Sequence, residues 1–117
     1  MVRKQDVATT GNTAARECIR QMVARMVERF APERVILFGS HARGEAGADS
    51  DVDLLVVMSV SGSRREKAVE IAVSLHDIGV PKDVIVTTPE EFAWRKDVMG
   101  TVEWPAAREG EVMYARA

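Results

Sequence analysis

Two stretches of the chain carry apolar residues at the three-and-four spacing of an amphipathic helix. The first begins after Asn12 or Thr13 as its cap and ends before Pro32, because proline lacks the amide donor and clashes with the preceding turn. Its apolar positions are Ala15, Cys18, Ile19, Met22, Val23, Met26, Val27 and Phe30. The second covers residues 64–78, and Gly79-Val80-Pro81 ends it. Its apolar positions are Ala68, Ile71, Ala72, Leu75 and Ile78.

Short apolar runs between and after these stretches predict strands. Residues 35–38 form a continuous apolar run bounded by Gly39, which is typical of a strand buried on both faces. Residues 51–58 and 84–86 predict two further strands. The order along the chain is therefore helix, strand, strand, helix, strand.

The C-terminal quarter begins with a helix-start signal. Thr88-Pro89-Glu90-Glu91 combines a threonine cap, a proline at the first helical position and a glutamate three residues after the cap. It predicts a helix through about Val98. Pro105 indicates the start of a short helix and Gly110 its end, and residues 112–114 predict a last strand at the sheet edge.

Length and composition fit one globular domain over residues 1–117, with residues 1–11 as a loose polar segment. The single Cys18 cannot form an internal disulfide, and no apolar run approaches the ~20 residues of a membrane span. Without an apolar signal sequence, we expect a cytoplasmic protein with no membrane contact. A net charge of -2 argues against general nucleic-acid binding.

An acidic pair is the first candidate for chemistry. Asp51 and Asp53 lie two residues apart on a predicted strand, which sends both side chains to one face with Cα atoms ~6.6 Å apart. Carboxylate oxygens are hard ligands that suit Mg²⁺. Cys18, His41 and His76 lack the spacing of zinc ligands. From the pair alone, an Asp51 that merely starts the strand and an Asp53 that faces solvent remain an alternative.

A glycine and a serine stand between the first strand and a helix-compatible segment. Gly39 lets a phosphate approach the backbone, and Ser40 supplies a hydroxyl beside the free amides of a helix start. The pattern is neither a Walker loop nor a dinucleotide fingerprint, and a plain turn is the simpler interpretation of these two residues alone. A serine hydrolase using Ser40 is excluded by the missing Gly-x-Ser-x-Gly elbow.

Together the two segments form a longer motif, Gly39-Ser40-His41-Ala42-Arg43-Gly44, then five residues, then Ser50-Asp51-Val52-Asp53-Leu54. This motif resembles the signature of the nucleotidyltransferase superfamily typified by DNA polymerase beta. The short chain and the closing Arg-Glu-Gly-x-x-x-Tyr resemble its minimal nucleotidyltransferase branch, over residues 34–115. The resemblance implies a nucleotidyltransferase fold of class α/β (α+β), a mixed sheet of about four to five strands backed by helices.

The reaction implied by the resemblance is transfer of a nucleoside monophosphate, such as AMP, from ATP or another NTP to an acceptor hydroxyl. In this family pattern Gly39 and Ser40 hold the nucleotide phosphates, and Asp51 and Asp53 hold Mg²⁺, of which two ions are expected. A third carboxylate acts as the base. Asp83 opens the third predicted strand and can lie beside the acidic pair, so we expect it to bind metal and accept the acceptor's proton.

Other residues around the motif have further expected roles. Asp77, at a helix end, is the weaker candidate for the third carboxylate. Arg43 either clamps the triphosphate or pairs with a carboxylate of the acidic loop. Ser50 is expected to belong to the nucleotide site because it forms a turn that orients Asp51. His41 is expected on the surface near the site. The two tryptophans, Trp94 and Trp104, favour core or partner contacts over base stacking.

From the length of this sequence we expect no separate acceptor-binding domain. The resemblance implies a small helical partner of the HEPN type, paired with this chain as toxin and antitoxin, and a homo- or hetero-oligomer. We expect an exposed apolar surface near Trp94, Met99 and Trp104 to bind it. Two alternatives remain: a non-catalytic antitoxin that masks its partner, and a stand-alone transferase acting on a small molecule.

Overall fold

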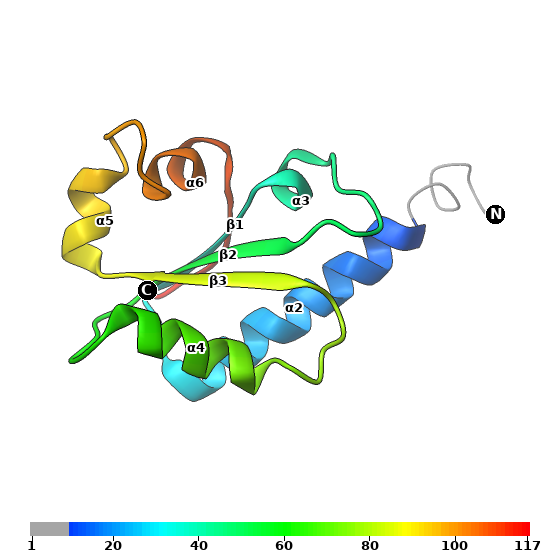
Figure 1. Cartoon of the computed structure of the whole chain (residues 1–117), viewed down its shortest axis with the longest axis horizontal. Helices are drawn as coiled ribbons and strands as arrows, with labels where there is room; N and C mark the ends of the chain where they lie inside the picture. Colours follow the sequence, from blue (N-terminus) through cyan, green and yellow to red (C-terminus); the bar gives the residue numbers. More distant parts are fainter. Residues whose placement is uncertain (1–9) are drawn as a thin grey trace.

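The computed structural model describes residues 10–117, in which one sheet separates two layers of helices (Figure 1). The strands are β1 (Arg34–Phe38), β2 (Val52–Val57), β3 (Lys82–Thr87) and β4 (Glu111–Ala115). The helices are α2 (Thr10–Phe30), α3 (Ser40–Arg43), α4 (Arg64–Ser74), α5 (Pro89–Arg95) and α6 (Glu103–Glu109). Helices α2 and α4 pack on one face of the sheet, and α5 and α6 pack on the other. This is the α+β class with a mixed sheet that the sequence predicts.

The strand order is β3-β2-β1-β4, with β2 and β3 parallel and the other two pairs antiparallel. Because β2 and β3 run in the same direction, their first residues meet at one end of the sheet. The buried central β1 and the edge position of β4 agree with the sequence predictions. The acidic motif lies at the end of the sheet where β2 and β3 begin.

Helix α2 buries the apolar face that the sequence predicts. The fully buried members of that face are Ile19, Met22 and Met26. Thr10 and Gly11 are already helical, so the predicted cap at Asn12 or Thr13 and the loose segment through residue 11 are wrong there, and residues 1–9 lie outside the described part. No helix within residues 10–117 is long and apolar enough to cross a membrane.

Two helices end earlier than their apolar spacing predicts. Helix α4 stops at Ser74, whose hydroxyl donates to the Ile71 carbonyl at 2.7 Å, and the His76 ring bonds the Val73 carbonyl at 2.9 Å. These side chains satisfy the last carbonyls, while turn residues after the helix still face the core. Helix α5 begins as predicted, with the Thr88 hydroxyl accepting from the Glu91 amide, but ends at Arg95.

A buried carboxylate ties α6 to the end of β3. Glu103 is only 2% exposed, and its oxygens accept from the Thr87 hydroxyl at 2.7 Å and the Arg95 guanidinium at 3.2 Å. Burial raises the pKa of the Glu103 carboxyl, but the bonds from Thr87, its own backbone and Arg95 outweigh burial and leave the pKa below its usual value. No local sequence pattern predicts this ion pair, because its partners lie on separate elements.

Candidate active site

The turn after β1 places a glycine directly against a carboxylate. Gly39 has φ 77° and ψ -157°, and a Cβ built there would lie 2.2 Å from Asp53 Oδ2. Its carbonyl accepts hydrogen bonds from the Ala42 and Arg43 amides, both at 3.1 Å, which start the single turn of α3. A side chain at this position would collide with the Asp53 carboxylate and adopt a backbone conformation that only glycine takes easily. The glycine therefore brings the backbone into contact with Asp53.

Strand register places two carboxylates side by side. Asp53, the second residue of β2, pairs with Asp83 in the neighbouring parallel β3. Alternation along β2 puts Asp53 on the same face as Leu55 and Val57, which pack under α5 and α6. Asp83 shares this face with Ile85, which packs against the same cluster. Both carboxylates therefore lie on the face that α5 and α6 cover, at the end of β2 and β3 where these helices do not bury the side chains.

The other carboxylate of the motif, Asp51, lies at the same end of the sheet. Asp51 directly precedes β2 and is exposed. The strand begins at Val52, whose amide donates to the Pro81 carbonyl at 2.8 Å, so the chain reaching Asp51 is held next to the chain that leads into β3. This contact brings the starts of the two strands together.

Electrostatics show that these carboxylates act on one another. Burial raises the pKa of Asp53, and the negative charges of Asp83 and Asp51 raise it further. His41 and Arg43 oppose these effects. Since one carboxylate repels two others across this small region, a cation bound between them would relieve that repulsion.

The donor set suits a hard divalent cation that brings its own further ligands. The three aspartates offer only oxygen donors. Within residues 10–117, no group of three or more His, Cys, Asp and Glu side chains is arranged to hold a metal ion on its own. Mg²⁺ typically takes one or two protein carboxylates and completes its shell with waters and substrate phosphates. The residues present therefore fit Mg²⁺ bound together with a phosphorylated substrate, and they do not form an all-protein metal cage.

The two side chains expected to contact phosphate, Ser40 and Arg43, have different surroundings. Ser40 begins α3 and is half-buried beside Gly39. Arg43 donates from Nε to Glu45 at 2.9 Å and lies 3.6 Å from Glu109. Of the two roles considered for Arg43, the structure contains the pairing with an acidic-loop carboxylate. The guanidinium would have to leave Glu45 in order to clamp a triphosphate.

The alternative third carboxylate lies elsewhere. Asp77 follows the end of α4 and forms an ion pair with Arg25 of α2. The Arg25 side-chain hydrogen bond lowers the pKa of Asp77 below its usual value. Of the two candidates, the structure brings only Asp83 into register with Asp53.

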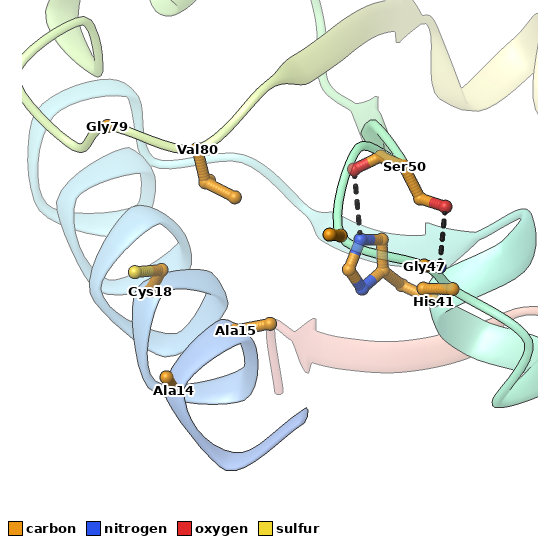
Figure 2. Close-up of a pocket in the computed structure, with 10 residues that line it drawn as sticks. Ala14, Ala15, Cys18, His41, Gly47, Ser50, Gly79 and Val80 are labelled. Carbon is orange, nitrogen blue, oxygen red and sulfur yellow. Dashed lines mark hydrogen bonds between the residues drawn. The ribbon is translucent and has the colours of Figure 1, made fainter. Parts of the chain in front are cut away.

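A cavity of about 460 Å³ lies between the start of α2 and the loop that leads to Asp51 (Figure 2). Its walls come from the first turns of α2, the loop between α3 and β2, and the chain before β3: Ala14, Ala15, Cys18, His41, Ala46, Gly47, Ala48, Ser50, Gly79 and Val80. His41 was expected on the surface, but it is half-buried, and its Nε2 lies 3.3 Å from the Ser50 carbonyl oxygen. The Ser50 hydroxyl accepts from the Gly47 amide at 2.8 Å, which forms the predicted turn before Asp51.

The tryptophans separate into two environments. Trp94 on α5 is 53% exposed and stacks under Arg95, with 5.6 Å from the guanidinium carbon to the ring centroid. Trp104 on α6 is half-buried and lies under Arg108 at 4.6 Å. Next to Trp94, Val98 and Met99 are 40% and 77% exposed. An exposed apolar surface is therefore present at Trp94 and Met99, with Trp104 largely covered.

Comparison with known proteins agrees with this geometry. The family model described as a nucleotidyltransferase domain matches residues 19–105, a span that contains the turn at Gly39 and all three aspartates of the site. No curated protein matches the chain significantly.

Three solved structures share the fold. A protein from Sulfolobus solfataricus assigned as a nucleotidyltransferase superposes with a TM-score of 0.60 and 22% identity, covering 86% of this chain and 79% of that one. A toxin–antitoxin complex with AMP-PNP gives a TM-score of 0.52 and 17% identity, covering 83% of this chain and 73% of that one. A mutant of the MntA–HpeT toxin–antitoxin pair gives 0.50 and 14%, also with 83% and 73% coverage. Because the family match spans most of the chain and both halves of its motif, the chain belongs to the nucleotidyltransferase domain family.

Proposed function

We propose that this chain is a Mg²⁺-dependent nucleotidyltransferase that moves AMP from ATP to a hydroxyl group on a helical partner protein of the HEPN type. The observation that carries the proposal is the placement of Asp53, which touches the Gly39 turn on one side and pairs with Asp83 on the other. In this role the chain is the antitoxin of a toxin–antitoxin pair and works as one domain in the cytoplasm. The toxin–antitoxin complexes that share its fold support this choice.

Each site residue has a distinct task in the proposed reaction. The Gly39 backbone and the Ser40 hydroxyl lie where the nucleotide phosphates can approach Asp53. Asp51 and Asp53 would hold Mg²⁺, together with Asp83. Bound Mg²⁺ supplies charge neutralisation for the phosphates and lowers the pKa of the acceptor hydroxyl. Asp83, opposite Asp53 in the sheet, holds the proton that the hydroxyl releases.

The bond changes balance without a covalent enzyme intermediate. The acceptor oxygen forms a bond to the α-phosphorus of ATP, and the bond between that phosphorus and the bridging oxygen of the β-phosphate breaks. The hydroxyl proton passes to an oxygen of Asp83, and pyrophosphate leaves with the electron pair of the broken bond. Positioning and electrostatics therefore account for the proposed catalysis, as in other phosphoryl transfers.

A protein acceptor is supported by the apolar surface at the end of α5. Trp94, Val98 and Met99 form this surface, which lies beyond the end of β3 that is remote from Asp83, with α6 between it and the strand starts (Figure 1). Large apolar side chains with more than a third of their surface exposed are typical of protein contacts when they cluster. A partner seated there has to extend along α6 to present a hydroxyl side chain to Asp53 and Asp83 at the starts of β2 and β3.

Intact-mass measurement of the partner tests the proposal. The chain is incubated with the helical protein encoded beside it, ATP and Mg²⁺, and we expect a partner heavier by one AMP. Asp53→Asn should abolish this mass change, and so should EDTA. Asp49→Asn is the matched control, because Asp49 is an exposed member of the same acidic loop and lies outside the site.

The other outcomes identify the alternatives. A partner that stays unmodified and is still neutralised by an Asp51→Asn/Asp53→Asn variant indicates an antitoxin that acts by masking. AMP transfer to a free small molecule, with neither complex nor partner modification, indicates a stand-alone transferase. Either result rejects the proposed protein acceptor.

A further inference from the structure

The loop that precedes Asp51 has no buried side chains. Residues 44–50 connect α3 to β2, and none of them is buried. Four of them, Ala46, Gly47, Ala48 and Ser50, line the cavity of about 460 Å³, so the loop borders open space instead of the core. A loop without buried side chains depends on hydrogen bonds for a fixed position.

One of these hydrogen bonds joins the loop to α3 immediately before Asp51. His41 Nε2 lies 3.3 Å from the Ser50 carbonyl oxygen (Figure 2). A carbonyl oxygen only accepts, so Nε2 carries the hydrogen and donates it. The Ser50 amide and hydroxyl are engaged with Gly47 of the same loop, at 3.2 Å and 2.8 Å. The His41 bond therefore links this local turn to a helix outside the loop.

Helix α3 is thereby connected to both acidic residues of the motif. At its start, Gly39 lies against the Asp53 carboxylate. Two residues later, His41 holds the carbonyl of the peptide that joins Ser50 to Asp51. Helix α3 therefore contacts the chain on both sides of Val52, through Gly39 at Asp53 and through His41 at the peptide before Asp51.

We infer that His41 is a positioning residue that holds the Asp51 carboxylate in place for the metal–nucleotide complex. The inference rests on the proposed function, since it concerns the same site, and it assigns His41 no contact with substrate. Losing the donor frees the loop end, so Asp51 spends less time in the arrangement that binds a divalent cation together with nucleotide phosphates.

Manganese binding tests this inference without relying on catalysis. Mn²⁺ replaces Mg²⁺, a non-hydrolysable ATP analogue is present, and free Mn²⁺ is followed by electron paramagnetic resonance. We expect His41→Met, which lacks the donor, to raise the half-saturating Mn²⁺ concentration about three- to tenfold, the range for one lost hydrogen bond. His41→Gln keeps an N–H donor at similar reach and should stay close to the wild type.

His76→Met is the matched control, because the His76 ring also bonds a backbone carbonyl, that of Val73, at the end of α4. It should change the melting temperature about as much as His41→Met while leaving Mn²⁺ binding unchanged. If the wild type binds no Mn²⁺ with the analogue, the proposed function and the inference both fail. If the wild type binds and His41→Met binds equally well, or His41→Gln is weakened as much as His41→Met, the inference alone is overturned.

Discussion

Replacing Gly39 with alanine tests whether the close contact between the turn and Asp53 serves the chemistry. The added Cβ would stand 2.2 Å from Asp53 Oδ2. Since non-bonded carbon and oxygen atoms settle at about 3.5 Å, the carboxylate has to move by roughly 1 Å or more. The obstructing atom is the end of a side chain, so we expect the carboxylate to rotate away and the fold to survive.

The backbone adds a second, smaller effect. Gly39 has φ 77° and ψ -157°, a region that is nearly restricted to glycine, and an alanine there costs about 1–3 kcal/mol. That strain lowers the melting temperature by about 4 °C for each kcal/mol in a domain of this size. A displacement of roughly 1 Å in a reacting group lowers turnover by about 10²-fold. We therefore expect a moderate loss of stability and a large loss of transfer.

Gly44→Ala provides the matched control. Gly44 ends α3 with φ 75° and ψ 20°, and a Cβ there has nothing within 4 Å. The variant should lose about 1–2 kcal/mol of stability from the left-handed backbone and keep most of its transfer activity. Thermal melts and the rate of AMP transfer are measured for both variants. Full transfer by Gly39→Ala, or an equal loss of transfer in Gly44→Ala, refutes the reasoning.

The remaining predictions concern the base, a buried ion pair and the partner surface. Asp83→Asn should lower turnover at least ~10²-fold with a smaller effect on nucleotide affinity, whereas Asp77→Asn should be mild; the reverse order contradicts the choice of base. Glu103→Gln should lower the free energy of unfolding by about 1–3 kcal/mol at neutral pH. Because folding lowers the pKa of Glu103, its stabilisation is present above the unfolded pKa and lost as pH falls through the folded one, so urea melts of wild type and variant should converge in acid; a constant gap argues against this. Met99→Asp should weaken partner binding about tenfold or more by calorimetry, while Val69→Asp on the opposite helical layer, also an exposed apolar position, should not.

The local features of the site could be predicted from the sequence alone. The Gly39-Ser40 turn after the first strand follows from the turn chemistry of these residues. The common face of Asp51 and Asp53 follows from period-two spacing along a strand. Both are properties of residues close together in the sequence. The same holds for the apolar face of α2 and the Thr88 cap of α5, which the structure confirms. These signals sufficed to identify the family before any contact between distant residues was known.

Contacts between distant residues were decided only by the tertiary structure. The Asp53–Asp83 pairing depends on the register of two parallel strands joined through a helix, and no local pattern fixes that register. The bond from His41 to Ser50 and the buried Glu103 pair likewise require segments that packing brings together. Trp94 and Met99 are exposed as predicted, but Trp104 of the same predicted surface is half-buried on α6. Spacing along a chain reports which face of an element is apolar, whereas the neighbours of that face are set by how the elements pack.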